Sequence, residues 1–235
     1  MTNTIQELIE RKSVRVFEER EISQEDKMLI LEAIANAPTA GNQQLYTVID
    51  VTDQALKDEL IKTCDNQPFI GKAKMVLVFC ADCKKWYDGY IDEDCGPRKP
   101  GVGDLLIAVS DANIAAQNGV TAAWSLGIGS CYIGDIMENC EEQRRLLKLP
   151  EYVFPAAMVV FGYPTRQQAD RKKPLRAPIE LIVSENAYPE MDADYREKLF
   201  ANKSQDMKAF CNRKYNSDFA REMTRSVAEY MKDFR

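Results

Sequence analysis

The chain is organised around residues 104–126, which read DLLIAVSDANIAAQNGVTAAWSL. Alanine, leucine, isoleucine and valine fall on nearly every side of the helix that this stretch predicts, which implies burial all round. Its length would also permit a membrane span. However, the two aspartates, two asparagines and one glutamine along it favour a buried core helix over a membrane helix. We therefore expect a central helix and no membrane partner.

Four stretches of strand length accompany this helix. The run Met75–Cys80 is fully apolar, as in a strand buried on both faces, and it lies within a strand predicted over 73–81. Residues 47–51 and 156–162 are also strand-like. Gly127 and Gly129 end the central helix with a left-handed cap and a close backbone approach, and a fourth strand follows at Ser130–Gly134.

Further helices are predicted from their caps. A capping box of Thr4 with Glu7 begins the first helix, Ser23 with Asp26 begins the second, and Asp53 begins the third. The apolar face expected for the second helix consists of Met28, Leu31, Ile34 and Ala35, and a short helix is expected at Glu141–Leu149, closed by Pro150.

Two regions lack this regularity. Residues 86–103 are rich in Asp, Gly, Pro and Tyr, and we expect an irregular excursion that could cover a site. Beyond residue 183, amphipathic segments at 193–202 and 218–234 flank a polar stretch at 203–216, with too few apolar positions to fold alone. We expect a single domain over 1–235, in which 184–235 is a C-terminal arm that wraps the body or a second subunit.

Composition limits the function. A net charge of −6 and a pI near 5.0 argue against a general nucleic-acid surface, so any phosphate site must be local. No secretory leader is visible, and the seven scattered cysteines are expected to be reduced thiols, so we expect a cytoplasmic protein. Cys80 and Cys83 have redox spacing, but they close a strand instead of opening a helix, which disfavours a thiol-disulfide role.

The chain contains no histidine, which excludes histidine-based triads, histidine zinc sites and histidine proton shuttles. No metal site is expected. An enzyme without histidine and without an obvious nucleophile is best explained by a bound cofactor that carries the chemistry. Neither a complete GxGxxG following a strand nor a Walker A loop is present, so a Rossmann site is rejected.

Three segments carry candidate ligands. Arg11-Lys12-Ser13-Val14-Arg15 places three cations and a hydroxyl together, which suits either a phosphate or the cation-rich end of the first helix. The loop Ala37–Gln44 offers Asn42 and Gln44, whose amides suit the edge of a heterocycle or a polyol, or it is an ordinary turn. Arg171–Arg176 is a second basic segment, or a solvated surface loop.

The order and spacing of these pieces resemble the FMN-dependent nitroreductase family. Within it, the likeness is to the oxygen-insensitive NADPH nitroreductases, a group that includes flavin reductases. The resemblance covers essentially the whole chain and rests on the following pieces: Arg11–Arg15, Ala37–Gln44, Asp65-Asn66-Gln67, Ser125–Gly129, Tyr132-Ile133-Gly134, Leu146–Pro150, Gly162-Tyr163-Pro164, the basic segment and Asn212-Arg213-Lys214.

The resemblance implies a homodimeric α+β fold with a mixed, mainly antiparallel sheet flanked by helices. It also implies terminal arms exchanged between subunits, and two FMN sites at the interface. The implied ligands of the phosphate and ribityl chain are Arg11, Ser13 and Arg15, with a further contact from Lys12, and Lys173 and Arg176 would return to the phosphate. Thr39 and its loop would come from the partner subunit, and Gln67 would bind the ring or the ribityl chain. Ile133 and Gly134 would lie against the isoalloxazine.

The sequence departs from the family pattern at two places. Lys173-Pro174-Leu175-Arg176 inserts a residue into the usual Lys-Pro-Arg, so that Arg176, or Lys172 with Lys173, would hold the phosphate. Asp135 follows Gly134 where a second glycine is common, and a carboxylate there would oppose an anionic reduced flavin unless it turns away.

The resulting hypothesis is an NAD(P)H-dependent flavoenzyme in which the flavin, and no indispensable side-chain acid or base, carries the chemistry. NADPH or NADH would be the co-substrate, and a nitroaromatic, quinone or similar small molecule the acceptor. A flavin reductase and a flavin-binding protein without turnover remain as alternatives.

Overall fold

The computed structural model describes residues 2–200 and 206–235. The chain forms two compact units. The first reaches from the N-terminus to Arg171 and resumes over Glu222–Arg235, and the second comprises Lys172–Arg221. The expectation of a single domain with an arm at 184–235 stays a prediction.

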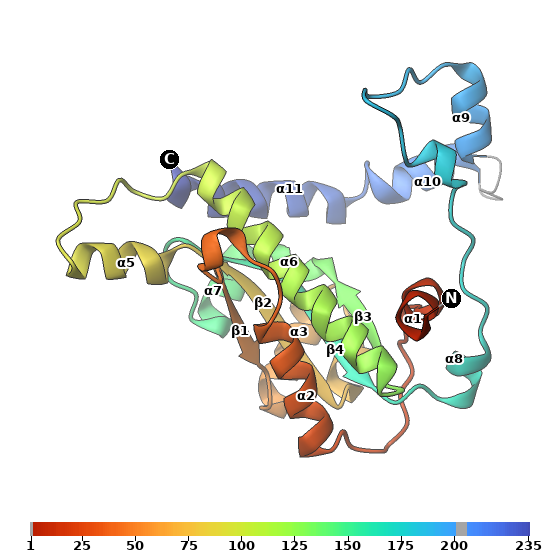
Figure 1. Ribbon diagram of the computed structural model, residues 1–235, viewed down its shortest axis with the longest axis horizontal. Helices are drawn as coiled ribbons and strands as arrows, with labels where there is room; N and C mark the ends of the chain where they lie inside the picture. The colour runs from red at the N-terminus through yellow and green to blue at the C-terminus, as the bar shows by residue number, and fades with distance from the viewer. Residues whose placement is uncertain (1, 201–205) are drawn as a thin grey trace. The chain divides into compact units, whose positions relative to one another are not determined.

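The first unit contains a four-stranded sheet in the order β1-β2-β4-β3 (Figure 1). Its strands are β1 (Tyr46–Asp50), β2 (Met75–Asp82), β4 (Val153–Gly162) and β3 (Gly129–Ile133), and every neighbouring pair is antiparallel. In the described residues, parallel pairing is confined to a single bridge that joins Ser13 to Ser130. The α+β class is confirmed, with one parallel bridge added to an antiparallel sheet.

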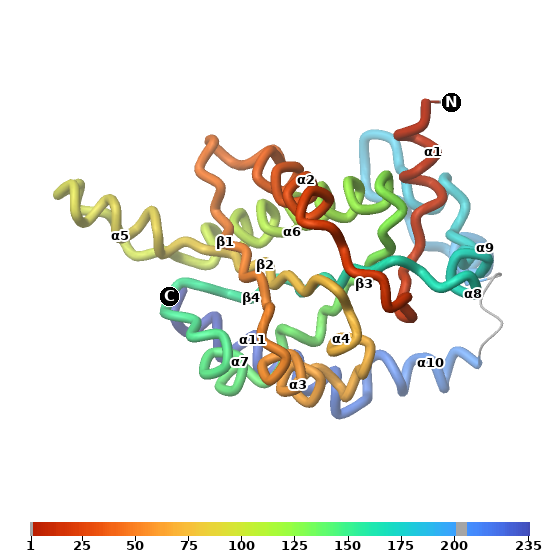
Figure 2. Tube along the Cα trace, turned by 90° about the horizontal axis from the view of Figure 1, so that it is seen from below, coloured from red at the N-terminus to blue at the C-terminus, as the bar shows by residue number. Residues whose placement is uncertain are grey.

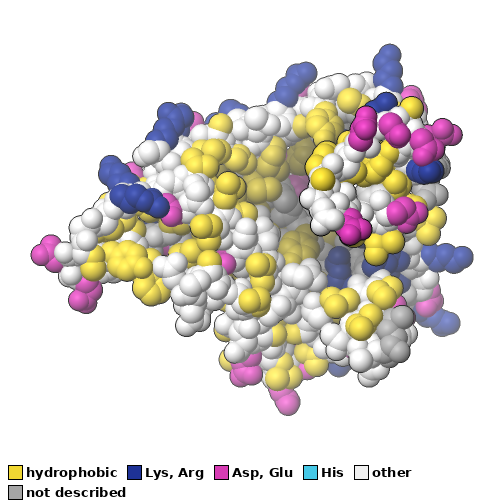
Figure 3. Space-filling model, turned by 45° about the horizontal axis from the view of Figure 1, so that its top comes forward, with side chains coloured by type: hydrophobic (Ala, Val, Ile, Leu, Met, Phe, Trp, Pro, Cys, Tyr) yellow, Lys and Arg dark blue, Asp and Glu magenta, His cyan; other side chains and the backbone are white. Residues whose placement is uncertain are grey.

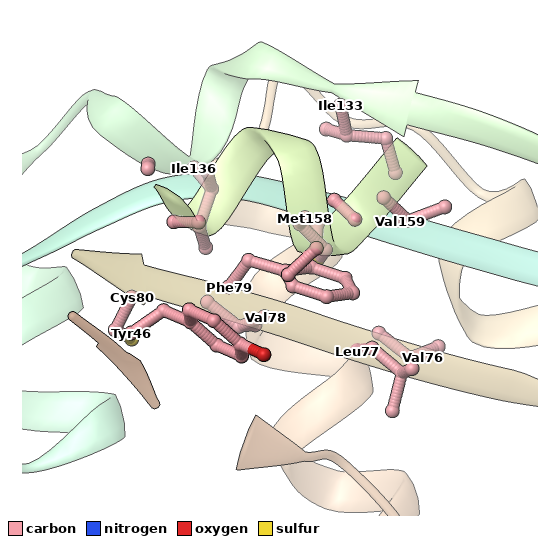
Figure 4. Packing of buried hydrophobic residues seen from close by; sticks show 14 of the residues in the cluster. Tyr46, Val76, Leu77, Val78, Phe79, Cys80, Ile133, Ile136, Met158 and Val159 are labelled. Atoms are coloured by element: carbon pink, nitrogen blue, oxygen red, sulfur yellow. The ribbon is translucent and has the colours of Figure 1, made fainter. Parts of the chain in front are cut away.

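β2 and β4 form the centre of the sheet, and all of their residues are buried. Their register shifts between Phe79 and Cys80, where Phe79 pairs with Ala157 and Cys80 with Pro155. Proline has no N–H to donate to a ladder, and a shift of register is a place where a strand tolerates it. Figure 4 shows the apolar side chains of these two strands meeting in the core.

Helix α6 (Val102–Ser125) lies on one face of the sheet beside α2 (Gln24–Ala35) (Figure 1). Its inner face is made largely of alanine, and a Cβ at Gly119 would lie 2.7 Å from Ile34, so the two helices pack closely. The expectation of burial all round is wrong. Leu106 is 62% exposed and Ile107 47% exposed, because small residues fill the contacts with the sheet while larger apolar residues face outward.

Helices α3 (Gln54–Thr63), α7 (Cys140–Leu147) and the last part of α11 (Asp218–Tyr230) cover the other face (Figure 2). Tyr230 is fully buried and packs edge-on against Phe154 of β4, with 5.1 Å between ring centroids. The C-terminal helix therefore completes the core of the first unit.

Two predicted helix features change. Helix α1 (Asn3–Glu10) follows Thr2 at the N-cap with no side-chain cap bond, so the capping box at Thr4 is wrong. The Ser23 cap is confirmed, since its hydroxyl accepts the Asp26 N–H. The expected face of α2 is confirmed in part: Ile34 is buried and Leu31 packs against the core, while Ile30 is buried in addition. Met28 is 45% exposed and Ala35 is exposed, so these two positions were wrong.

Helices also occur where irregular chain was expected. α5 (Lys84–Asp92) occupies the first part of the 86–103 excursion, and α10 (Met207–Lys214) lies within the polar 203–216 stretch. α9 (Ala193–Phe200) is confirmed in type, while its expected end at residue 202 lies outside the described residues. The remaining short elements are η1 (Ala40–Asn42), α4 (Phe69–Lys72), η2 (Gly134–Met137), α8 (Arg166–Asp170), η3 (Ile179–Leu181) and η4 (Met231–Phe234).

Over residues 2–200 and 206–235, each helix falls short of the combined length and hydrophobicity that a membrane crossing requires.

Candidate functional site

The segment after α1 runs along the edge strand β3. The N–H of Val14 donates to the carbonyl of Ser130 at 2.9 Å, and further along the N–H of Glu18 donates to the carbonyl of Tyr163 at 2.8 Å. A Cβ at Gly129 would lie 2.5 Å from the Val14 side chain, so this approach requires glycine. The predicted left-handed cap just before it is confirmed, with φ of +75° at Gly127.

The close contact at Gly129 gives a first prediction. Gly129→Ala is expected to destabilise the protein by about 1–3 kcal/mol, because the added methyl overlaps Val14 and the backbone must move. The shift would displace Arg11–Arg15 from β3, and the urea midpoint should fall. Gly103→Ala is the matched control, since open space surrounds its Cβ position, and equal losses in the two variants would contradict the assignment.

The side chains of this segment gather over β3. Burial raises the pKa of the Cys131 thiol, while the charges of Arg15 and Arg11 lower it in part, so both cations lie close to β3. Arg15 also lies over the Phe69 ring, 5.9 Å from its centroid. Arg11 Nη1 is buried and has no hydrogen-bond partner in the described structure. A buried guanidinium nitrogen without an acceptor is costly, and an anion bound beside it would remove that cost.

Lys12 differs from its neighbours. Its Nζ donates to the carbonyls of Ala169 and Arg171, while the Arg171 guanidinium donates to the carbonyl of Ser13 at 2.6 Å. Lys12 and Arg171 therefore fasten the segment to the chain that follows β4. Because the Lys12 side chain makes these hydrogen bonds, the expected contact of Lys12 with a ligand would come from its backbone.

Gln67 lies in the link between α3 and α4. Its Nε2 donates to the carbonyl of Cys64 at 3.0 Å, and the two residues before it, Asp65 and Asn66, have φ of 56° and 52°. Asparagine and aspartate tolerate this left-handed region better than most residues. Phe69, beneath Arg15, joins this link to the cationic segment.

The end of β3 completes the cluster. Ile133 is buried, and the exposed Gly134 begins the 3-10 turn η2. The charge of Asp135 raises the pKa of the Cys64 thiol and of the Glu138 carboxyl, which places Asp135 on the side of the α3–α4 link. The first unit thus brings the cations, the Gln67 link and the end of β3 together.

Thr39 and Asn42 lie elsewhere. The Thr39 hydroxyl donates to Asp111 of α6, which also accepts the N–H groups of Ala40 at 3.0 Å and Leu45 at 3.2 Å. Ser125 lies fourteen positions after Asp111 in α6, which at a rise of 1.5 Å per residue is about 21 Å. Ser125 marks the end of α6 that leads into β3, so one chain does not bring Thr39 and Asn42 to the cation cluster.

Lys173 and Arg176 belong to the second unit. Their expected approach to the flavin phosphate stays a prediction.

Two features escaped the sequence analysis. Asp111 was noted only as a polar interruption of the central helix, but it is 3% exposed and holds the 39–45 loop by three donors. Glu138 was not singled out, although it is 6% exposed and burial raises its pKa to about 7. The only available signal for Glu138 was a charged residue directly after the apolar pair Ile136-Met137.

The cysteines do not form a redox pair. Cys80 and Cys83 are buried free thiols, and burial raises the pKa of each to about 12. A thiol that keeps its proton is a poor nucleophile, which agrees with the expectation from sequence.

Known proteins resemble this chain along most of its length. Residues 8–163 match the model of the nitroreductase family. The chain is 32% identical to an FMN reductase [NAD(P)H] of Bacillus subtilis over 98% of this chain and 91% of that protein. It is 34% identical to an oxygen-insensitive NADPH nitroreductase of Salmonella typhimurium over 86% and 79% of the two chains. The structure of NADPH:FMN oxidoreductase from Vibrio harveyi in complex with NAD⁺ superposes with a TM-score of 0.82 at 26% identity, covering 98% of both chains.

Proposed function

The chain belongs to the nitroreductase family, and from that premise we propose that it is a homodimeric FMN enzyme that uses NADPH or NADH to reduce nitroaromatic, quinone or similar small acceptors. The observation that carries the proposal is the buried Nη1 of Arg11, which lacks an acceptor while Arg15 lies nearby over β3. Two guanidinium groups and the Ser13 hydroxyl have the chemistry of a phosphate site.

The residues present fit FMN. Arg11, Ser13 and Arg15 would hold the phosphate end, and Gln67 would offer its amide to the ribityl chain or the ring. Gly134 lacks a side chain at the exposed end of β3, where a flat ring needs close approach to the backbone. When bound between these residues, FMN would supply the redox chemistry that links a nicotinamide donor to the acceptor.

The chain's own contribution is position and charge. The cations fix one end of the cofactor, and backbone N–H groups near Gly134 are available to the polar edge of the ring. Fixed donors of this kind stabilise negative charge that develops during reduction. None of the candidate ligands needs to act as an acid or base, in keeping with the absence of histidine.

A second subunit is part of the proposal. Thr39 is bonded to Asp111 in the middle of α6, about 21 Å along the helix from the end that leads into β3, so a partner is needed to bring Thr39 and Asn42 to the flavin. The exposed apolar residues also favour one, since α6 exposes Val102, Leu106, Ile107 and Ile114, and α1 exposes Ile5, Leu8 and Ile9. Figure 3 shows hydrophobic side chains in several places on one face of the surface. Apolar surface of this extent marks an interaction site.

Leu106→Lys is expected to break the dimer, because a charge would replace a 62% exposed apolar side chain at the proposed interface. Light scattering after size exclusion should give the monomer mass, and flavin should be lost with it. Ala55→Lys on α3 adds the same charge on the other face of the sheet and should leave the dimer intact. A Leu106→Lys dimer with normal flavin content would contradict the proposed interface.

The function is tested by an anaerobic titration of the purified protein with NADPH and with NADH, followed at the flavin absorbance band. A yellow protein that is bleached by one equivalent of donor, and regains its colour with a nitroaromatic or quinone, supports the proposal. A protein that never binds FMN would overturn it.

The relatives named as FMN reductases favour a second candidate, in which free flavin is the acceptor. Steady-state kinetics with free FMN, quinones and nitroaromatics separate the two. A flavin-binding protein without turnover would be yellow and would resist bleaching. The cytoplasmic location is also proposed, on the support of seven free cysteines, since reduced thiols persist in a reducing compartment.

A further inference from the structure

Glu138 is a buried carboxyl at the end of the turn that begins at Gly134. Its backbone N–H donates to the carbonyl of Asp135 at 3.0 Å and closes η2. The side chain is 6% exposed, and Oε1 is buried without a hydrogen-bond partner in the described structure. A carboxylate in such a place lacks the donors that normally compensate its burial.

The charges that act on Glu138 in the described part of the chain are all negative. They belong to Asp135 of η2, Asp65 of the α3–α4 link and Glu222 of α11. Arg225 offsets part of the Glu222 charge, since its guanidinium donates to Glu222 and to Glu141 of α7, and these bonds do not include Glu138. The Glu222 carboxylate also accepts the Asn139 N–H at 3.2 Å, so Glu222 keeps its charge.

A buried carboxyl among carboxylates holds its proton more tightly than an exposed one. Burial is the larger cause and the neighbouring charges the smaller, and together they raise the pKa of Glu138 to about 7. Glu138 therefore changes its charge near neutral pH. One further negative charge nearby would raise its proton affinity again.

Reduction of the flavin would supply that charge. A flavin that accepts a hydride without an additional proton becomes anionic, and its ring is proposed to lie at Gly134, where η2 begins. Glu138 directly follows η2, four positions after Gly134. The flavin charge would then add to the negative charges that already act on the buried Glu138 carboxyl, so the carboxylate would be neutralised.

We propose that Glu138 takes up one proton from solvent when the flavin is reduced and releases it when the flavin is reoxidised, which makes electron transfer proton-coupled at this residue. The inference rests on the proposed function. The balance is simple: the hydride carries both electrons from the nicotinamide to the flavin, and the Glu138 carboxylate becomes a carboxylic acid with a proton from the buffer. No other oxidant or reductant is required.

Proton uptake tests the inference directly. Hydride transfer from NADPH that yields an anionic reduced flavin consumes no proton from solvent. Any proton that is taken up must therefore bind to a group of the protein. The holoprotein is reduced anaerobically with one equivalent of NADPH at pH 8, in weak buffer containing a pH-indicator dye. We expect uptake approaching one proton per flavin in the parent, and one proton less per flavin in Glu138→Gln.

Equal uptake by Glu138→Gln and the parent would overturn the inference. Glu142→Gln is the matched control, since this α7 carboxylate is exposed and paired with Arg145, and its uptake should equal that of the parent. A second readout is the midpoint potential, which falls by about 30 mV per pH unit for each proton taken up with two electrons. Above pH 7, the midpoint potential of the parent should fall more steeply with pH than that of Glu138→Gln, by up to the slope that corresponds to one additional proton.

The experiment distinguishes failure of the Glu138 proposal from failure of the proposed function. If NADPH does not bleach the protein, the proposed function is contradicted, because no flavin is reduced. A protein that is bleached with the same proton uptake in both variants fails only the assignment of Glu138. Glutamine keeps the shape of the protonated acid, so folding should be retained, and the flavin spectrum of the variant verifies this.

Discussion

Arg11→Met is expected to weaken FMN binding by about 2–5 kcal/mol, roughly 30-fold to several-thousand-fold. The guanidinium has a buried Nη1 without an acceptor, and we assign it to the flavin phosphate. Methionine keeps an unbranched apolar stem of similar reach, so the packing beside β3 is largely preserved while the charge is lost. Fluorescence titration of the deflavinated protein with FMN measures the change.

The stability of the deflavinated protein separates binding from folding. Without an anion, the buried nitrogen of Arg11 is a cost, so the apoprotein of Arg11→Met should be at least as stable as the parent. Arg20→Met is the matched control, because Arg20 lies over the Tyr163 ring at 3.8 Å, away from the proposed ligands, and its loss should leave FMN affinity unchanged. An apoprotein that unfolds in Arg11→Met would assign Arg11 to structure instead of to the flavin.

The sequence was sufficient for the elements whose signal is local. Met75–Cys80 is apolar throughout and of strand length, and it forms the fully buried β2. Ser23 and Asp53 are polar caps before helical periodicity, and both accept a backbone N–H at the start of their helices. These patterns depend on neighbouring residues only, which is why composition and spacing revealed them.

The errors arise where the relevant neighbour is distant in the chain. α6 reads as buried on all sides because an exposed apolar residue has the same sequence signature as one in a core. Which residues of α2 are buried depends on the position of Gly119 in α6, which no local pattern specifies. Asp111 was similarly hidden, since its three donors come from a loop some 70 positions earlier.

The candidate site divides in the same way. Arg11–Arg15 was identified from its residue types, and the structure adds why it lies on β3, namely the close contact of Val14 with Gly129. The orientation of Asp135 could not be inferred from the sequence, because it depends on the α3–α4 link packing beside η2. The pKa of the Glu138 carboxyl is raised by burial and by charged residues of three separate segments. The spacing of residues in the sequence does not reveal such a cluster.

Glu138 should also leave a signature in stability. An unfolded glutamate titrates near pH 4.5, while the folded pKa is raised to about 7. Below pH 4.5, Glu138 is protonated in both the folded and the unfolded state, so its ionisation does not change the free energy of unfolding. Between pH 4.5 and 7 the unfolded chain ionises first, so the native state loses stability as pH rises, by a total of about 3 kcal/mol, and the loss is complete above pH 7.

Glu138→Gln removes this loss because the amide does not ionise. The free energy of unfolding of the variant minus that of the parent should therefore rise by about 3 kcal/mol between pH 4.5 and 7 and stay constant above it. Urea unfolding at pH 5, 6, 7 and 8 with saturating FMN measures the difference, in which carboxylates shared by both proteins cancel. Glu142→Gln removes an exposed carboxylate of α7 and is the control, since a rise of equal size in it would assign the effect to the loss of any carboxylate. A flat difference for Glu138→Gln would mean that Glu138 is ionised in the native protein, and the cluster around η2 would then have to carry its negative charges without a shared proton.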